Sequence, residues 1–515
     1  METIQNLLPK GLPVSAQIIG ATILLSLLYS FLTKNRPWSG FPLISVHGLG
    51  PRKSWLSHGE DVLAEGLKKT NGPFQVMTGT GPKIVLPNRY ADEIRNLPEL
   101  NFPKAFVSDF FVNYPGFEAH KQGFTDGHLL RDTIRIKLTQ SLGLVTTDLV
   151  DETISTVDDV FGQSGEWTTR TIREDLLEVV ARVSSRVFLG AGLCRNRRWL
   201  DIAKTFTTDT FALSFIMRMV PAIIRPFAYL AAPHSARLRK SVRDAHTLIL
   251  PEVNKRKAAV DAARAAGEKP PKVADTIGWM YDIAKAKGEA KGKDFDFVYG
   301  QLSLTMAAIH TTTESTCRAL LDLCKHPEMA QQLRDEVIEV VGREGWAKTT
   351  LYKLRLMDSF LKEGQRMTPL ASVSMNRYVE TPVTLSDGTV LPKGARICVV
   401  SDFANPDVYA EPGKFDAARF AKKRLEPGQE NSWQFVTTSA SHLNFGHGEH
   451  ACPGRFFASN EIKIILCHLL LKYDWRFVPD APEPLPRRFE SSKSVRPDTH
   501  IQARRRKAEI DLDAL

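Results

Sequence analysis

The chain has 515 residues, of which 43% are hydrophobic and 24% charged, and its formal net charge is +10. This length allows a large core and a prior of about three domains, but no repeat or long low-complexity tract divides the sequence. The positive charges are not confined to one segment and no nucleic-acid motif is visible. An anionic membrane surface or an acidic protein is therefore a better candidate partner than nucleic acid. The six cysteines form no Cys-x-x-Cys pair and no dense framework, which indicates a reducing compartment.

The N-terminal segment has the pattern of a membrane anchor. No Asp, Glu, Lys or Arg occurs from Leu12 to Leu32, and a helix over this run would span about 31 Å, enough for a bilayer core. Basic residues follow it, which predicts that the rest of the chain stays cytosolic. The alternative is a cleaved signal peptide, whose apolar region is shorter. We expect an uncleaved anchor over 1–36 and a single domain over 37–515, whose first residues, the Pro/Gly-rich stretch 37–51, form a stiff linker into the rest of the body.

Helical periodicity dominates the middle of the chain, and strand signals are fewer. The expected elements are helices over residues 176–188, 238–256 and 295–325, a hairpin over 383–391 and a strand over 396–400. His326-Pro327 ends the longest helix, because the residue before a proline disfavours helical geometry. The pattern predicts a mainly α-helical protein with small β-sheets, an α+β mixture.

Residues 206–230 are unusually apolar. One interpretation is plain core. Pro221 and Pro226 argue against a single continuous core helix, and a lid over a binding site that dips into a membrane is the other interpretation. Both remain open from the sequence.

Within the predicted helix over 295–325, Ala307 and Ala308 leave room for a ligand against the backbone, and Thr311 could place a hydroxyl there. The alternative is an ordinary helix whose threonines bond back to carbonyls. His310 is expected to titrate near neutrality and could move a proton. Glu314, one turn further on, is a weaker candidate.

Glu363 and Arg366 place an acid and a base on one helix face. An exposed pair of this kind contributes little to stability. Arg419 follows them in the chain, ahead of a distinctive cysteine segment.

That segment runs from Phe445 to Arg455 and holds Cys452 between two glycines, with Pro453 directly after the cysteine. Residues 456–473 then have the periodicity of a helix. A single thiolate can hold a haem iron, and a helix N-terminus favours its negative charge. A lone cysteine is more often a small buried hydrophobe, so the spacing around it decides.

The spacing Phe-x-x-Gly-x-[Arg/His]-x-Cys-x-Gly resembles the cysteine-ligand loop of the cytochrome P450 haem-thiolate monooxygenases. The form with His450, and with Pro-Gly-Arg-Phe-Phe-Ala after Cys452, is similar to the fungal microsomal branch. The resemblance covers roughly residues 37–500. It implies the cytochrome P450 fold with an N-terminal transmembrane helix, and haem b (iron protoporphyrin IX) as the cofactor with Cys452 as the axial ligand.

The resemblance also implies roles for the other residues. Glu363, Arg366 and Arg419 match the Glu-Arg-Arg triad that locks the fold behind the cysteine loop. Ala307 to Thr312 resembles the oxygen-activation motif, with His310 where an acid is usual and Thr311 in the proton network. The haem contacts that the resemblance implies are Arg131, Arg135, Arg377, Phe445 and His450. Of the arginines, we favour Arg135 and Arg377 over Arg131.

These correspondences imply a monooxygenase that inserts one oxygen atom from O2 into a hydrophobic small molecule, a terpenoid or other fungal secondary metabolite. No Gly-rich dinucleotide loop of the expected kind is visible, so electrons would come from NADPH through a separate NADPH-cytochrome P450 reductase, with cytochrome b5 as a second donor. The implied location is the endoplasmic reticulum membrane, with the body facing the cytosol. Two alternatives are a reductase-independent haem isomerase or dehydratase and a non-enzymatic haem-binding protein.

Overall fold

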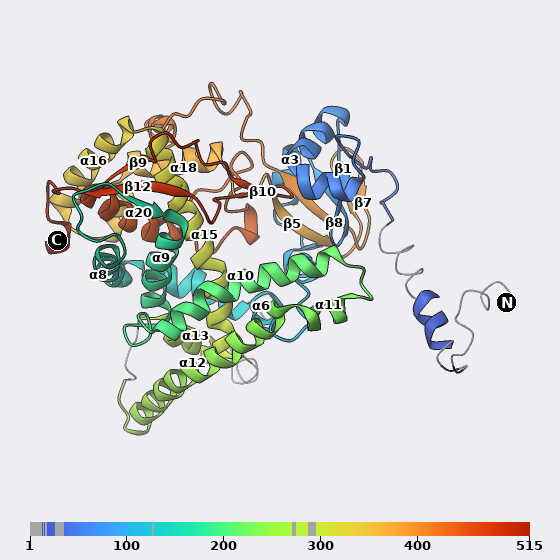
Figure 1. Ribbon diagram of the computed structural model, residues 1–515, viewed down its shortest axis with the longest axis horizontal. Coiled ribbons are helices and arrows are strands. Elements are labelled where there is room, and N and C mark those ends of the chain that lie inside the picture. Colours follow the sequence, from blue (N-terminus) through green and yellow to red (C-terminus); the bar gives the residue numbers. More distant parts are fainter. Residues whose placement is uncertain are drawn as a thin grey trace.

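The computed structural model describes residues 36–125, 128–269, 274–286 and 295–515, together with 13, 15 and 18–25. Helices predominate and the strands are short (Figure 1). The helices are α3 (Pro51–Lys69), α4 (Ala91–Ile94), α5 (Phe102–Phe110), α6 (Glu118–Thr125), α7 (His128–Asp132), α8 (Leu142–Phe161), α9 (Ile172–Leu189), α10 (Arg197–Met219), α11 (Arg225–Ala231), α12 (Pro233–Ala265), α13 (Thr276–Ala286), α15 (Phe297–Lys325), α16 (Glu328–Glu344), α17 (Lys348–Lys353), α18 (Arg355–Met367), α19 (Arg419–Lys423) and α20 (Arg455–Lys472). A π-helical turn, Thr133–Leu138, follows α7.

The strands form one five-stranded sheet and three smaller ones. They are β1 (Phe74–Thr78), β2 (Gly81–Leu86), β3 (Leu100–Asn101), β4 (Thr168–Thr171), β5 (Val373–Val379), β6 (Val383–Thr384), β7 (Val390–Leu391), β8 (Arg396–Val400), β9 (Tyr473–Phe477), β10 (Arg487–Phe489), β11 (Ser492–Ser494) and β12 (His500–Arg505). The largest sheet has the order β1-β2-β8-β5-β3 and lies beside α3 (Figure 1). Its β2 and β8 are parallel, with Val85 opposite Cys398, and its other pairs are antiparallel. The smaller sheets are β4-β12-β9, β10-β11 and β6-β7.

Helix α15 is the axis of the helical part. Asp296 caps its first turn by accepting hydrogen bonds from the backbone N–H groups of Val298 and Tyr299, at 2.8 and 3.2 Å, which satisfies donors that have no partner within the helix. Helices α6, α9, α10, α12 and α20 pack around it. The largest cluster of buried apolar residues extends over these helices.

Most elements expected from the sequence are confirmed within a few residues. The helix expected over 295–325 is α15, and His326 follows its last residue. The hairpin expected over 383–391 is β6 and β7, and the expected strand over 396–400 is β8. The mainly helical fold with small sheets is therefore confirmed.

The interpretation of residues 37–51 as a stiff linker is wrong, although their assignment to the domain over 37–515 agrees with the contacts they make. Gln75 of β1 donates side-chain hydrogen bonds to the carbonyls of Trp38 and Phe41, at 2.8 and 2.6 Å. The backbone of Ile44 also pairs with that of Gln75, and the side chains of Phe41 and Ile44 are buried. Because the backbone of this segment is satisfied by the first strand, it is part of the folded body.

The predicted anchor lies mostly outside the described residues. Residues 18–25 are helical, with exposed isoleucine and leucine side chains. In the part of the chain that the structure describes, no helix is both long and apolar enough to cross a bilayer. The boundary at residue 36 therefore stays a prediction.

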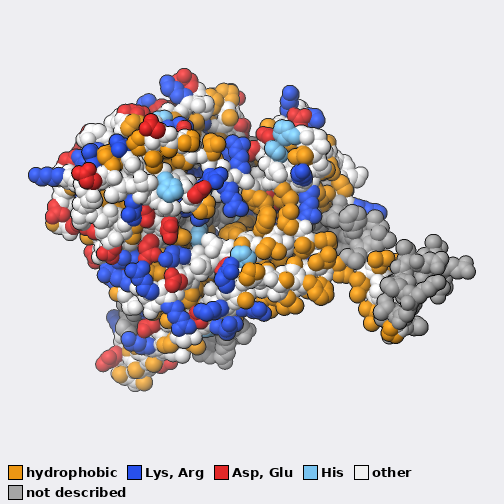
Figure 2. Space-filling model, viewed as in Figure 1, with side chains coloured by type: hydrophobic (Ala, Val, Ile, Leu, Met, Phe, Trp, Pro, Cys, Tyr) orange, Lys and Arg blue, Asp and Glu red, His pale blue; other side chains and the backbone are white. Residues whose placement is uncertain are grey.

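Residues 206–230 form the second half of α10, a turn and α11, and they are not plain core. One side is buried, including Phe206, Leu213 and Met217. Large apolar side chains on the other side are exposed: Phe211, Phe215, Met219, Ile224, Phe227 and Leu230. Figure 2 shows hydrophobic side chains gathered on the face over α10 and α11. We call these six side chains the α10–α11 patch.

Candidate active site

The middle of α15 carries an accessible stripe although helices surround it. Ala307 and Thr311 are exposed and Ser315 is half-buried, whereas the neighbouring Ile309, Thr312 and Thr313 are buried. Ala307, Thr311 and Ser315 follow an i, i+4, i+8 spacing and so share one helix face. The Thr311 hydroxyl donates to the Ala307 carbonyl at 2.7 Å, which leaves its oxygen able to accept a hydrogen bond from a ligand.

The loop before α20 holds Cys452 with its own backbone. The Cys452 N–H donates to the Phe445 carbonyl at 2.7 Å, and Phe445 packs edge-to-face on Phe435. Gly448 has a φ of +75°, and a Cβ atom there would lie 2.6 Å from the carbonyl oxygen of Arg95. Only glycine fits both restrictions, so this turn fixes the approach to Cys452.

The Cys452 thiol is half-buried, like the residues on either side of it. Burial raises its pKa, while the backbone N–H groups of Gly454 and Arg455 and the Arg455 charge lower it. The start of α20 therefore favours the thiolate, as the sequence predicted, but the effect of burial on the pKa is larger than that of the helix start. A bound metal cation would supply the stabilisation that the protein groups do not.

Three residues expected to hold anionic groups lie close together. Arg377 on β5 is buried, and its Nη2 atom has no hydrogen-bond partner among the described residues. Burial lowers the pKa of Arg377 to about 10. The pKa of His450 falls to about 4, first through burial and then through the charges of Arg377 and Arg131. Arg131 lies 3.5 Å from Glu449.

Arg135 is placed differently. It is exposed on the π-helical turn, and its charge acts on Arg455, three residues after Cys452. The structure therefore brings Arg131, Arg377 and His450 together and leaves Arg135 on the Arg455 side. The preference for Arg135 over Arg131 stays a prediction.

Glu363, Arg366 and Arg419 form one buried cluster. The Arg366 Nε and Nη2 atoms each donate to a Glu363 carboxylate oxygen at 2.8 Å, and Arg419 Nε lies 3.1 Å from both oxygens. Arg366 also donates to the carbonyls of Phe403 and Pro412. The charges and donors of this cluster are thus satisfied internally, and none of its three residues lines the cavity of about 860 Å³ between α5, α10 and α15.

Comparisons with known proteins agree with this arrangement. The family model described as cytochrome P450 matches residues 122–503. The chain belongs to the cytochrome P450 family. It is 42% identical over 95% of both chains to the cytochrome P450 monooxygenase bsc2 of Alternaria brassicicola. It is 39% identical to cytochrome P450 monooxygenase 1 of Gibberella fujikuroi over 85% of this chain and 99% of that one. It is 38% identical to the dihydromonacolin L monooxygenase LovA of Aspergillus terreus over 85% of this chain and 82% of that one.

Cytochrome P450 proteins are oxidoreductases that bind haem b, use redox partners and act on small molecules. The residues of this chain fit that group. Cys452, a half-buried residue, offers a thiolate ligand for the iron, and the unsatisfied Arg377 Nη2, with the Arg131 and His450 groups beside it, offers donors for the carboxylate arms. The bound haem supplies the oxygen chemistry, and the chain supplies its ligand, its protons and the placement of the substrate.

His310 does not behave as the sequence predicted. Its Nε2 atom lies 3.0 Å from the Lys204 carbonyl oxygen and therefore carries the hydrogen. Burial, with the charge of Arg173, lowers its pKa to about 4. The expectation that His310 titrates near neutrality is wrong, because packing against α10 removes it from water. At neutral pH it has no acidic proton to give.

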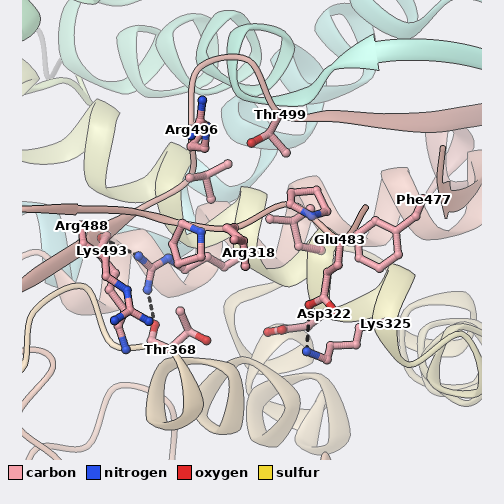
Figure 3. A pocket seen from close by; sticks show the side chains of 15 residues that line it. Arg318, Asp322, Lys325, Thr368, Phe477, Glu483, Arg488, Lys493, Arg496 and Thr499 are labelled. Carbon is pink, nitrogen blue, oxygen red and sulfur yellow. Dashed lines mark hydrogen bonds and ion pairs between the residues drawn. The ribbon is translucent and has the colours of Figure 1, made fainter. Parts of the chain in front are cut away.

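Glu314 is also committed elsewhere. Its carboxylate accepts from Arg318 Nε at 2.9 Å and from the Val495 N–H at 2.7 Å. Figure 3 shows Arg318 in a pocket of about 230 Å³ on this side of α15, with its guanidinium toward the carbonyl of Thr368. Glu314 therefore stabilises the contact between α15 and the segment before β12.

A cavity of about 860 Å³ adjoins this region, between α5, α10, α15 and the β10–β11 hairpin. His310, the residue before Thr311, lies in its wall. Six phenylalanines line it: Phe102, Phe106, Phe110, Phe211, Phe215 and Phe489. Its size is in the range of pockets for drug-sized ligands, and its walls favour a hydrophobic one.

Sequence reasoning missed Glu461 on α20. Its carboxyl group is fully buried and accepts from the Ser184 hydroxyl at 2.6 Å. Burial raises its pKa to about 8, against smaller opposing effects of Ser184 and Thr312. It lies nine positions after Cys452 in a helix with apolar neighbours, and an unpaired glutamate at a buried helix position is the signal that could have found it.

We expect Glu461→Gln to change how stability depends on pH. The folded pKa is raised above the unfolded value, so the folded state binds more protons between about pH 4.5 and 8. The contribution of Glu461 is therefore fully present below pH 4.5 and is lost as pH rises toward 8. Glutamine keeps the shape without ionising. Urea unfolding should give similar stabilities at pH 5 and a variant that is more stable by roughly 3–5 kcal/mol at pH 8.5, since one pKa unit corresponds to about 1.4 kcal/mol. Equal pH dependence in both proteins would contradict the raised pKa.

Proposed function

We propose that this chain is a membrane-anchored monooxygenase of the endoplasmic reticulum. It inserts one oxygen atom from O2 into a hydrophobic small molecule, a terpenoid or other fungal secondary metabolite. The observation that carries the substrate class is the aromatic cavity of about 860 Å³ that reaches His310, next to Thr311. NADPH-cytochrome P450 reductase is the proposed electron donor, with cytochrome b5 as a second one.

The test is reconstitution of the full chain with that reductase in membranes. Terpenoid extracts are supplied with and without NADPH, and products are read by mass spectrometry with ¹⁸O2. Incorporation of one labelled oxygen atom that requires both NADPH and reductase supports the proposal. Unlabelled product formed without NADPH would favour the isomerase or dehydratase alternative.

Thr311 is proposed to govern how tightly NADPH consumption is coupled to product. Its hydroxyl is exposed on the accessible stripe of α15, and positioned proton transfers contribute typically 10²–10⁴-fold. Thr311→Ala should bind haem normally, consume NADPH and release several-fold more peroxide per product. The ratio is measured beside that of His310→Ala, for which we expect a smaller change because His310 is neutral and bonded to Lys204. Uncoupling in His310→Ala alone would make His310 the relay.

The anchor over residues 1–36 and the α10–α11 patch are proposed to contact the same membrane. The six exposed apolar side chains of the patch favour a lipid surface over water. A chain that starts at Pro37 should therefore keep its haem spectrum but leave the membrane only partly. Adding Phe227→Ser and Leu230→Ser to the truncated chain should release most of the remainder, as measured by flotation. Full release of the truncated chain without the two substitutions would exclude the patch as a membrane contact. Extraction of the full chain by carbonate would exclude an anchor that spans the membrane.

A further inference from the structure

Arg173, the second residue of α9, lines the large cavity without a hydrogen bond. Its Nε atom is buried with no partner, and the described part of the chain provides no hydrogen-bond acceptor for the rest of the guanidinium. The nearest carboxylate oxygen belongs to Glu314, at 3.9 Å from Nε, and 22% of the Arg173 side chain is accessible. Glu314 Oε1 accepts from Arg318 and Val495, and its Oε2, the oxygen that faces Arg173, lies 3.9 Å from Arg173 Nε, beyond hydrogen-bond distance.

The other cations of the cavity wall are accounted for. Lys83 lies 3.2 Å from Asp109 and donates to Asn376. Arg218 has a buried Nε without a partner, as Arg173 does, but its Nη2 donates to the Asp109 carbonyl at 2.9 Å. Arg487 is exposed, so water can solvate it. The charged side chains that line the cavity are Lys83, Arg173, Arg218, Arg487, Asp109 and Glu490. Cations therefore outnumber carboxylates in the wall. Among them, Arg173 is the partly enclosed side chain that donates no hydrogen bond to a described residue.

A partly enclosed guanidinium without an acceptor is unfavourable. A carboxylate is the planar partner that a guanidinium binds through two parallel hydrogen bonds. The charge of Arg173 also acts on His310, so both lie on the α15 side of the cavity. An anionic group bound there would direct an apolar skeleton toward the phenylalanines of α5 and α10.

We propose that the cavity takes a hydrophobic carboxylic acid and that Arg173 binds its carboxylate. This inference rests on the proposed function, because it treats the cavity as the substrate site. It narrows the substrate class to amphipathic acids whose hydrocarbon part fills the aromatic wall.

The test uses isothermal titration calorimetry on the haem-loaded full chain, with abietic acid and its methyl ester as matched probes. The wild-type chain should bind the acid about 10- to 100-fold more tightly than the ester, the range expected for charge-assisted hydrogen bonds. Arg173→Gln should lose this preference, because the variant should bind the acid more weakly while its binding of the ester is unchanged. Arg173→Lys should retain part of it, and Arg487→Gln, which alters an exposed cation of the same wall, should retain all of it.

Equal binding of acid and ester by the wild-type chain overturns the inference, as does binding of neither. An acid preference that survives in Arg173→Gln also overturns it. The Arg173→Gln chain must keep the haem spectrum and unfolding temperature of the wild type, which is expected because no residue that the structure describes depends on Arg173 for a hydrogen bond. Failure of NADPH-dependent oxygen insertion would count against the proposed function, whereas the calorimetric comparison requires no turnover.

Discussion

Cys452→Ser is expected to abolish the thiolate signature of the bound haem. The ferrous carbonyl complex of the wild-type chain should show the red-shifted Soret band of a thiolate ligand, and the variant should lose it. A serine hydroxyl is a far weaker donor to iron, while the loop itself keeps its shape. The bond from the residue 452 N–H to the Phe445 carbonyl and the turn at Gly448 do not involve the sulfur.

Cys324→Ser is the matched control. Cys324 is also half-buried and unpaired, but it lies in the last turn of α15, and its substitution should leave the band unchanged. Monooxygenase activity should fall by several orders of magnitude in Cys452→Ser alone. A normal carbonyl spectrum in that variant would make another residue the iron ligand.

Local sequence signals predicted the parts of this protein that local geometry determines. The cysteine loop was found because glycines and a proline at fixed offsets specify one backbone path. The C-terminal end of α15 was found because the residue before a proline, here His326, disfavours helical geometry. The Glu363–Arg366 pair was found from its i, i+3 spacing, and only the order of motifs suggested that Arg419 would join it.

Burial and long-range contacts determine the rest, and the sequence does not display them. From the sequence His310 is expected to titrate near neutrality, whereas burial, followed by the charge of Arg173, lowers its pKa in the folded chain. Residues 37–51 looked like a linker because prolines and glycines are common in linkers, whereas Gln75 holds this segment to β1. Arg173 was not noticed at all, since a single arginine at a helix start has no pattern that marks it as enclosed.

Glu363→Ala is expected to prevent accumulation of folded, haem-loaded protein. The side chain of Glu363 is fully buried and holds two arginines, so its removal leaves the Arg366 and Arg419 charges without their counter-ion. Breaking a buried pair in this way costs roughly 3–5 kcal/mol, a large part of the stability of a typical protein.

A matched control separates burial from spacing. Asp261 and Arg264 form an acid–base pair at the same i, i+3 spacing on α12, but both are exposed and 3.8 Å apart. Asp261→Ala should change the unfolding free energy by less than about 0.5 kcal/mol, because exposed pairs contribute little. The yield of haem-loaded protein and its unfolding temperature are measured for both variants.

A Glu363→Ala protein that is stable and haem-loaded but inactive would show that Glu363 acts in catalysis and does not stabilise the fold. The expected result is the reverse, since its carboxylate oxygens already accept from Arg366, Arg419 and the Asp416 N–H, and none of these groups lines the large cavity at His310.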